Sequence, residues 1–476
     1  MRTIAKNSLA NMSWTVMDLV FTMIMTAYVA RILLADGVGR VAYAQSIAIY
    51  FLTFAEFGIS GYGIREIAGA GIKKDNAEKI FTELFVINMI TTTGSIVAYC
   101  IMMPHFTKIW EDRFLFIICG ISIVFNYCNV EWFYRGKEEY VYIAVRNMLL
   151  KILSLTAVYT FVRTKNDYAV YALIACVVGG LSGMIDLCRL HKFIRPAFFG
   201  ISPGKHIKPL MVFMISNLLT NGYGKIDITM LGMLSTKTAV GYYSYTYAPV
   251  RMIMVITTSI SQVMYPRLSY SYRKEQDQFY RLLDTGIRMV IFTVFPAGMG
   301  VFILAPQLIQ IFLGNAFVPA VRTLRILSIL IIIQGFADLC FQVILATGSE
   351  KRRVWALGAA IVGNMALNGF LIPLWADCGA AAASVLSELG LNGYLIGSMK
   401  RRVNFEIPWE AVGQALICTG LMGIAVHRII QLDLSAVILC VIAVLCGIIV
   451  YGVLNLLLKN KLMEMLVHKM AARLHR

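Results

Sequence analysis

Charged residues are scarce in this chain. Asp, Glu, Lys and Arg make up 14% of its 476 residues, whereas a soluble domain carries roughly 25%. Hydrophobic residues make up 59%, so the chain lacks the polar surface that a water-soluble protein of this size needs. Each membrane-spanning helix takes about 20 apolar residues. The composition therefore predicts an all-α polytopic membrane protein without a sizeable soluble domain.

Histidine is also rare, and the cysteines are scattered. The chain has 6 His and 10 Cys, and no two of the cysteines form a Cys-x-x-Cys pair. Neither a metal-ligand cluster nor a disulfide framework is indicated, and small buried thiols are the expected role for these cysteines. No His/Asp or Ser/His cluster suggests a catalytic centre. We therefore expect no metal, no cofactor and no enzymatic activity.

Hydropathy, Pro/Gly punctuation and charge clusters divide the chain into about fourteen spans. The basic start of the chain runs into a long apolar stretch, which we interpret as the first span and not as a cleavable signal peptide. The predicted spans cover residues 8–33, 38–61, 79–103, 113–134, 139–162, 167–192, 207–233, 239–266, 283–306, 320–347, 354–376, 378–399, 409–430 and 434–458.

The positive charges are distributed unevenly between alternate loops. Of the 43 Lys and Arg, 28 fall in one set of loops and 8 in the other, with seven inside the spans. The positive-inside rule then predicts that both termini are cytoplasmic. The same bias accounts for most of the net charge of +17, because basic clusters beside spans face anionic lipid headgroups. We expect no nucleic-acid partner.

Two parts of the chain match at an offset of 202 residues. Gly39-Arg40-Val41-Ala42-Tyr43 follows the first span, and Gly241-Tyr242-Tyr243-Ser244-Tyr245 follows the seventh. The same offset pairs Lys6 with Lys208 and Arg65 with Arg267. Six spans per copy gives two lobes in parallel orientation. We predict an N-terminal lobe at 1–200, a C-terminal lobe at 201–402, and an additional span pair with a basic cytoplasmic tail at 403–476.

Several short motifs are spread along the chain from about residue 4 to residue 400. They are Arg31–Gly39, Tyr43–Ile47, Phe57–Ile59, Arg65–Ala68, Glu131–Glu138, Lys225–Asp227, Met230–Gly232, Val240–Tyr243, Asn368–Pro373, Gly379–Ala381 and Ser387–Glu388. As a set they resemble the Wzx-type polysaccharide flippases, which belong to the multidrug/oligosaccharidyl-lipid/polysaccharide exporter superfamily. The extra span pair departs from relatives with twelve spans and is similar to the lipid II flippases of the same superfamily.

The resemblance implies a flippase for undecaprenyl-diphosphate-linked oligosaccharide in the bacterial inner membrane, working by alternating access for cell-surface polysaccharide such as O-antigen or exopolysaccharide. Its partners would be the lipid-linked glycan, membrane lipids, and a polymerase and glycosyltransferases of the same pathway. Two alternatives stay open. One is a cation-coupled multidrug or small-molecule exporter of the same superfamily, and the other is a membrane-embedded glycan polymerase or ligase.

Seven cations lie within the predicted spans. A charge at the bilayer centre costs about 2.5–3.5 kcal/mol on insertion scales, so it usually faces a cavity or a partner. Arg288, Arg322 and Arg325 lie near span ends, where long side chains can reach the interface. The remaining four are predicted to line a cavity and hold the diphosphate, with neutralisation by acids of other helices as the alternative. These four are Arg251, Lys225, Arg146 and Lys151.

Acidic residues inside the spans form two predicted groups. Asp18 and Asp227 lie at mid-depth and could neutralise cations in the empty cavity. Asp338 and Glu388 could carry protons in coupled transport, or make structural polar contacts. A second group is expected nearer the cytoplasmic interface, and it consists of Glu56, Glu83, Glu131 and Asp186.

Overall fold

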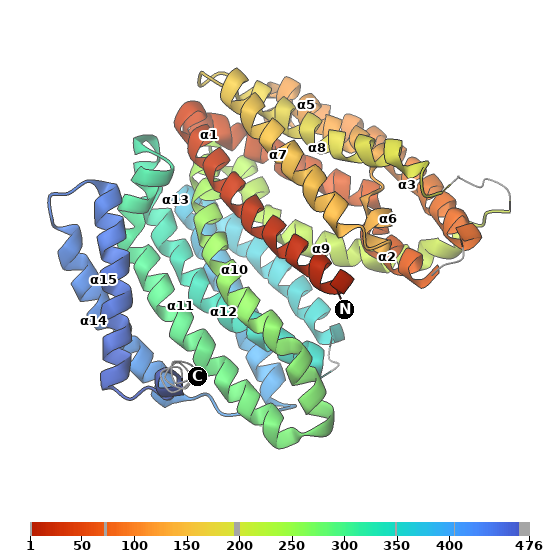
Figure 1. Cartoon of the computed structure of the whole chain (residues 1–476). Helices are drawn as coiled ribbons and strands as arrows, with labels where there is room; N and C mark the ends of the chain where they lie inside the picture. Colours follow the sequence, from red (N-terminus) through yellow and green to blue (C-terminus); the bar gives the residue numbers. More distant parts are fainter. Residues whose placement is uncertain (1, 71–73, 195–199, 348–349, 404, 466–476) are drawn as a thin grey trace. The chain divides into compact units, whose positions relative to one another are not determined.

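The computed structural model describes residues 2–70, 74–194, 200–347, 350–403 and 405–465, with the side chains of 2–16, 74–75, 256 and 350–354 excepted. Every regular element in these ranges is helical (Figure 1). The helices up to α9 are α1 (Arg2–Glu56), α2 (Ile59–Ala70), α3 (Lys74–Met102), η1 (Met103–His105), α4 (Thr107–Glu111), α5 (Arg113–Phe125), η2 (Asn126–Cys128), α6 (Glu131–Gly136), α7 (Tyr140–Phe161), α8 (Tyr168–Leu190) and α9 (Gly204–Leu234).

The rest of the described chain is also helical. Its helices are α10 (Lys237–Lys274), α11 (Gln276–Phe312), η3 (Asn315–Ala320), α12 (Val321–Ala346), α13 (Glu350–Lys400), α14 (Trp409–Ile430) and α15 (Ala436–Leu457). An all-α fold is therefore confirmed. Some residues of the orientation prediction lie outside the described part of the chain. They are the basic tail at 466–476, residues 71–73 and 195–199, and the side chain of Lys6.

Packing divides the chain into two compact units, Met1–Gly241 and Tyr242–Arg476. Helix α9 belongs to the first unit because it packs against α1 and α2. The predicted lobes at 1–200 and 201–402, with the span pair at 403–476, describe a repeat of spans and stay a prediction.

Nine helices among the described residues are long and apolar enough to cross a membrane. Two of them, Met17–Ala70 and Trp355–Lys400, contain 54 and 46 residues, more than twice what one crossing takes. Each is interrupted by a non-helical residue, Leu34 in α1 and Ala376 in α13. These breaks lie where the sequence predicted the ends of spans 8–33 and 354–376. A multi-pass membrane protein is confirmed, whereas the count of fourteen spans stays a prediction.

The predicted span 113–134 is wrong as a single helix. The structure divides it into α5, the short η2 turn and α6. Asn126 explains the division, because its carbonyl accepts a hydrogen bond from Asn88 Nδ2 at 2.8 Å and from the Asn129 N–H, three residues on, at 3.0 Å. Its own amide donates to Asn88 Oδ1 and Thr92 Oγ1, each at 2.9 Å. Side chains of α3 therefore satisfy the backbone and amide groups that end α5.

Aromatic residues form the core of the first unit. Phe81 of α3 stacks on Trp132 of α6, with ring centroids 5.4 Å apart. Phe133 and Tyr134 are also fully buried and pack edge-on against each other and against Phe193. Aromatic pairs of this kind add to the burial of apolar area. These aromatic residues form the packed core of the unit that carries the polar residues of α6, α7 and α8.

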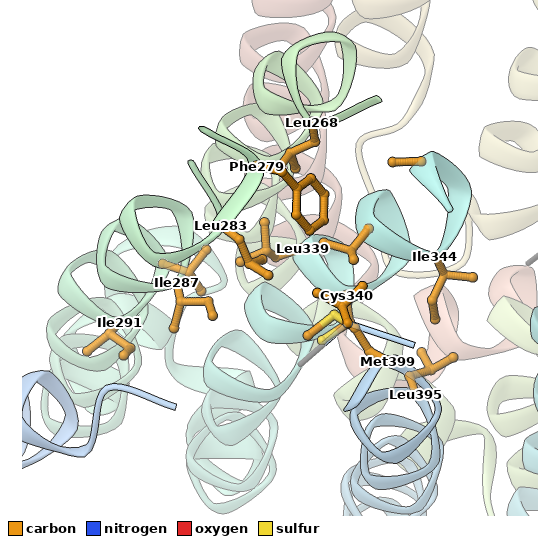
Figure 2. Close-up of a cluster of buried hydrophobic side chains, with 14 of the residues drawn as sticks. Leu268, Phe279, Leu283, Ile287, Ile291, Leu339, Cys340, Ile344, Leu395 and Met399 are labelled. Carbon is orange, nitrogen blue, oxygen red and sulfur yellow. The ribbon is translucent and has the colours of Figure 1, made fainter. Parts of the chain in front are cut away.

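The second unit has an aliphatic core between α11, α12 and α13 (Figure 2). Leu283 and Ile287 of α11 are buried together with Leu339 of α12 and Met399 of α13. A separate cluster joins α11 to the C-terminal pair α14 and α15 through residues such as Leu304, Met422 and Ala443. The predicted span 409–430 coincides with α14.

Candidate functional site

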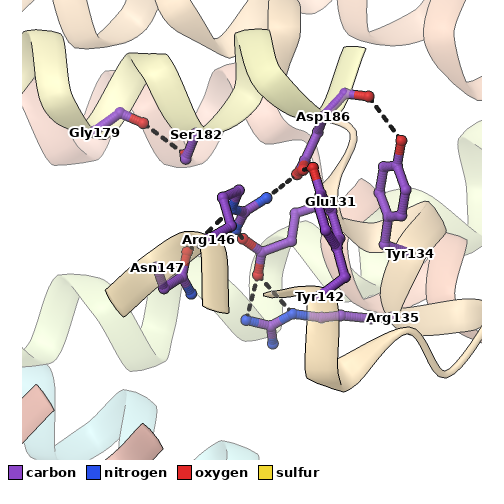
Figure 3. Close-up of polar contacts among 9 residues, drawn as sticks. All are labelled: Glu131, Tyr134, Arg135, Tyr142, Arg146, Asn147, Gly179, Ser182 and Asp186. Carbon is purple, nitrogen blue, oxygen red and sulfur yellow. Dashed lines mark hydrogen bonds and ion pairs between the residues drawn. The ribbon is translucent and has the colours of Figure 1, made fainter. Parts of the chain in front are cut away.

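Arg146 lies at the centre of an ion-pair cluster within the first unit (Figure 3). Its guanidinium projects from α7 between Asp186 of α8 and Glu131 of α6, and it binds both carboxylates. The side chains of Arg146 and Asp186 are 3% and 0% exposed. Breaking such a buried pair leaves an uncompensated charge, so the three residues hold their helices in one arrangement.

Further donors complete this cluster. Tyr142 donates a hydrogen bond to Asp186 Oδ1 at 2.8 Å, and Tyr134 donates to the Asp186 carbonyl at 2.7 Å. Arg135 binds the second oxygen of Glu131 at 2.6 Å. Asp186 is fully buried and pairs with Arg146, while the depth expected for Glu131 and Asp186 near the cytoplasmic interface stays a prediction. For Arg146, the structure shows the neutralised arrangement that the sequence left open.

Lys151, one turn and a residue further along α7, has a partner as well. Its Nζ lies 2.9 Å from Asp18 Oδ1 on α1, and both side chains are more than a third exposed, at 38% and 40%. Lys151 also lines a cavity of about 440 Å³ with Thr22, Thr26 and Tyr171. Lys151 and Asp18 are therefore brought together as the sequence suggested, beside open space.

A second cavity, of about 410 Å³, lies inside the first unit and carries Lys225 on its wall. The wall is polar for a membrane-spanning bundle, since amides and carboxylates contribute from several helices. Lys225 is the predicted ligand that lines this cavity together with Glu131 and Asp186, whereas Asp227 lies outside its lining. Other polar residues of this wall are Gln45, Glu56, Ser122, Asn126, Asn129 and Ser182.

Several of these wall residues were not predicted. Asn129 Nδ2 approaches Glu56 Oε1 at 3.4 Å, and Ser60 approaches Glu56 Oε2 at the same distance. Asn126 and Asn129 follow the end of α5, where a pair of amides inside an apolar segment was the signal available in the sequence. Glu56 lines the cavity, and its expected depth near the cytoplasmic interface stays a prediction.

Arg251 differs from the cations of the first unit. It lies on α10 in the second unit, its side chain is exposed, and no ion pair joins it to a residue that the structure describes. Asp338 of α12 accepts a hydrogen bond from Thr258, a residue of the same helix as Arg251. Arg251 therefore keeps a charge that no described carboxylate neutralises.

Glu388 of α13 is 6% exposed and lies among amides. Gln334 Nε2 donates to Glu388 Oε1 at 3.3 Å, and Asn392 Nδ2 lies 3.4 Å from Oε2. The Oδ1 atom of Asn392 is buried without a hydrogen-bond partner among the described residues. These contacts make Glu388 part of a buried polar group, and the predicted coupling role stays a prediction.

Another charged cluster lies where α10 begins. Arg40 Nη1 binds Asp112 Oδ1 at 2.6 Å, and Lys237 Nζ lies 3.9 Å from Asp112 Oδ2 and 3.9 Å from the Tyr43 ring centroid. Burial lowers the pKa of Lys237 from 10.5 to about 8, and Asp112 opposes the shift. The ammonium is held by one distant carboxylate and one aromatic face.

Two glycines let helices meet closely beside this cluster. A Cβ atom on Gly39 would lie 1.7 Å from the Lys237 carbonyl oxygen, and one on Gly241 would lie 2.0 Å from the Ala35 carbonyl oxygen. These are the glycines that the 202-residue offset pairs. The backbones of α1 and the first turn of α10 are therefore in direct contact, which a side chain at either position would prevent.

Glu83 anchors the beginning of α9 to α3. It is 0% exposed and accepts hydrogen bonds from the Ser202 N–H at 2.7 Å and from Lys205 Nζ at 3.0 Å. His206 Nε2 lies 2.8 Å from the second oxygen, and His206 Nδ1 lies 2.8 Å from the Tyr62 hydroxyl. Three residues before and within α9 cover the Glu83 carboxylate, and its depth near the cytoplasmic interface stays a prediction.

The described residues contain no group of three or more His, Cys, Asp or Glu side chains that could hold a metal ion.

Comparison with known proteins identifies the family of the chain. The model of the family described as "Polysaccharide biosynthesis protein" matches residues 4–271, more than half of the chain. The chain belongs to this family. The MatE family model also matches, over residues 213–370.

Individual relatives of this polysaccharide biosynthesis protein agree with the family. A protein of Escherichia coli (strain K12) named "Putative O-antigen transporter" is 22% identical over 378 residues, which cover 76% of this chain and 88% of that protein. The "Probable low-salt glycan biosynthesis flippase Agl15" of Haloferax volcanii is 24% identical over 246 residues, which cover 49% of this chain and 50% of the relative.

The fold has a solved counterpart. The structure described as "Lipid II flippase MurJ, inward closed conformation" has a TM-score of 0.72 and is 14% identical in sequence. The match covers 93% of this chain and 99% of the chain of that structure. At this identity the likeness concerns the fold alone. Together the matches confirm the resemblance to Wzx-type flippases. The chain is a membrane flippase of the multidrug/oligosaccharidyl-lipid/polysaccharide exporter superfamily, and a transporter rather than an enzyme.

Proposed function

We propose that this flippase moves undecaprenyl-diphosphate-linked oligosaccharide from the inner to the outer leaflet of the bacterial inner membrane. The observation that carries the proposal is the family match over residues 4–271, because every residue that lines the cavity of about 410 Å³ falls within it. A polar cavity inside a membrane protein suits a headgroup that must leave water.

The lining offers suitable chemistry for both parts of that headgroup. Side-chain amides and carboxylates, such as those of Asn129 and Glu56, can bond to sugar hydroxyls as donors and acceptors. Lys225 supplies a point charge for a phosphate oxygen. In the second unit, Arg251 has an exposed guanidinium, which can bind two phosphate oxygens at once. Lys225 and Arg251 are thus the preferred phosphate ligands in their own units.

Arg146 and Lys151 take different roles in this proposal. Arg146 maintains the wall of the cavity through Asp186 and Glu131, and it does not bind the cargo. Lys151 exchanges its carboxylate partner Asp18 for the cargo when the headgroup enters the neighbouring space. Asp227, Asp338 and Glu388 remain proposed for neutralisation or coupling.

The membrane potential can drive the step in the proposed direction. Moving one elementary charge through 100 mV is worth about 2.3 kcal/mol. With a negative cell interior, export of two uncompensated negative charges gains about 4.6 kcal/mol per 100 mV by the same relation. In this proposal both termini are cytoplasmic and the two units work by alternating access. Because the membrane potential favours export, the cycle does not require a coupling ion.

Deletion of the gene tests the proposal. We expect lipid-linked oligosaccharide to accumulate on the cytoplasmic leaflet, where an impermeant sugar oxidant added to spheroplasts does not reach it, while surface polysaccharide disappears. Lys225→Ala and Arg251→Ala should each fail to restore export at normal protein level. Lys165→Ala, which changes an exposed loop lysine, is the matched control. Unchanged surface polymer in the deletion strain would refute the proposal.

The MatE match over residues 213–370 favours one alternative, a cation-coupled exporter of small molecules. The carboxylates Glu56, Glu131 and Asp186 on the cavity wall would suit a cationic drug. Drug accumulation in the same deletion strain separates the two functions. Higher intracellular drug with normal surface polysaccharide would support the exporter over the flippase.

A further inference from the structure

Two arginines at the beginning of α12 form no ion pair within the part of the chain that the structure describes. Arg322 and Arg325 occupy the first two turns of this helix, three residues apart, so their side chains lie on the same side of it. Neither forms an ion pair or a side-chain hydrogen bond with a residue that the structure describes, and Arg325 Nε is buried without any partner. The guanidinium of Arg325 lies 5.5 Å from the centroid of the Phe302 ring.

The helix itself makes this placement unfavourable. The N-terminal end of a helix carries a partial positive charge, so cations there are repelled and anions are attracted. Helix α12 has no acidic residue in its first turn, and Ala320 before it provides no side-chain cap. Asp377, which is near enough to accept a hydrogen bond from Thr323, forms no ion pair with either arginine. The Val321 N–H at the start of α12 bonds the Val318 carbonyl of η3, and Asp377 is held by Thr323. The two guanidinium groups are therefore the groups of this region that stay available to an anion.

The surroundings of this region are apolar and open. Phe302 of α11, Val318 of η3 and Ile329 of α12 are 43%, 52% and 42% exposed. Ile329 follows Arg325 by four residues and Arg322 by seven, so it continues the same side of the helix. A surface of this kind suits acyl chains, and the positive-inside rule predicts that this end of α12 lies at the outer interface.

We infer that Arg322 and Arg325 form a binding site for the phosphate of an anionic phospholipid headgroup at the end of α12. The guanidinium groups bind the phosphate oxygens as donors. Phe302 and Ile329 contact the start of the acyl chains. Arginine suits this role better than lysine because its planar fork binds two oxygens. The site is independent of Lys225 and of the proposed cargo.

Native mass spectrometry of the full-length protein tests this inference. The protein is equilibrated with phosphatidylglycerol or with phosphatidylcholine of the same acyl chains, and retained lipid is counted. We expect wild type to retain phosphatidylglycerol preferentially. R322Q/R325Q should bind it about tenfold more weakly, while R322K/R325K should keep an intermediate affinity. The matched control is R163Q/R428Q, which removes two other exposed arginines that are predicted to lie on the outer side.

The outcomes are decisive in both directions. Equal retention of phosphatidylglycerol by R322Q/R325Q and R163Q/R428Q, or no preference over phosphatidylcholine, overturns the inference. Retention of undecaprenyl diphosphate in place of phosphatidylglycerol by wild type overturns it as well, since the site would then serve cargo. Melting curves of each variant show whether it is folded, and the lysine variant provides a readout if R322Q/R325Q is unstable. Loss of export in Lys225→Ala leaves this result unaffected.

Discussion

The two compact units hold their charges in different ways. In the first unit, the cations inside the bundle are paired across helices, as Arg146 is with Asp186 and Lys151 is with Asp18. In the second unit, Arg288 pairs with Asp284 one turn away on its own helix, whereas Arg251, Arg322 and Arg325 form no ion pair with any residue that the structure describes. Carboxylates of α12 and α13 accept hydrogen bonds from hydroxyls and amides, as Asp338 does from Thr258.

This difference suggests a division of work. A buried ion pair holds helices in one arrangement, and removing one partner is costly. A cation without a carboxylate partner contributes little to the fold, but it is available to an anion. The first unit therefore provides a rigid polar wall, while the second provides uncommitted positive charge. Stability measurements on single charges can break or sharpen this comparison.

The largest effect is expected for Arg146→Ala. Asp186 would stay fully buried without its counter-charge, and such a change costs about 3–5 kcal/mol of unfolding free energy. Thermal unfolding in detergent measures it. Arg135→Ala is the matched control, because Arg135 binds the same Glu131 from a side chain that is 51% exposed, and it should cost about 0–1 kcal/mol. Equal costs for the two variants would contradict the rigid wall.

Adding Asp186→Asn to Arg146→Ala separates charge from packing. The double variant has no buried carboxylate to compensate, so it should recover part of the lost stability. If the double variant is no more stable than Arg146→Ala, the lost stability comes from packing of the arginine stem. The first unit would then be held rigid by side-chain packing and not by the ion pair.

A smaller effect with a clear pH signature is expected at Lys237. Burial lowers its pKa to about 8 in the folded protein, against about 10.4 in an unfolded chain. Between these values the unfolded state binds more protons, so stability rises with pH in that interval. The unfolding temperature of wild type minus that of Lys237→Met should therefore increase from pH 8 to pH 10. Lys165→Met should give a flat difference, and a falling Lys237 curve would show that its ammonium is well compensated.

The pair between Lys151 and Asp18 should be weaker still. Both side chains are more than a third exposed, and exposed pairs contribute about 0.2–1 kcal/mol. A double-mutant cycle with Lys151→Met and Asp18→Asn measures the coupling directly. A coupling above about 2 kcal/mol, well beyond the usual range for exposed pairs, would place this pair with Arg146 in the rigid wall and remove it from the proposed exchange with cargo.

Much of the fold could be predicted because each crossing leaves a local mark in the sequence. The limits of α14 agree with the span predicted from hydropathy, and the breaks at Leu34 and Ala376 lie at predicted span ends. The end of α5 could not be predicted in this way. It depends on Asn88, which lies 38 residues earlier in the chain.

The site was harder to predict for the same physical reason. Helical spacing shows which residues share a face of one helix, but it does not show which helix lies opposite. Arg146 and Asp186 are 40 residues apart in the chain, so their pairing could not be predicted from the spacing within either helix. Arg251 could be proposed from its depth alone, because a mid-span cation is unusual whatever its neighbours are, and its role in the site stays a prediction.

Arg251→Ala is expected to have the smallest effect on stability and the largest on transport. The side chain is exposed and has no ion-pair partner among the described residues, so its loss should change the unfolding free energy by about 0.5 kcal/mol or less. Export should nevertheless stop, because the proposed phosphate ligand is removed. Comparing melting temperature with surface polysaccharide in one strain measures both. A variant that unfolds as easily as Arg146→Ala would show that Arg251 is structural, and the contrast between the units would then disappear.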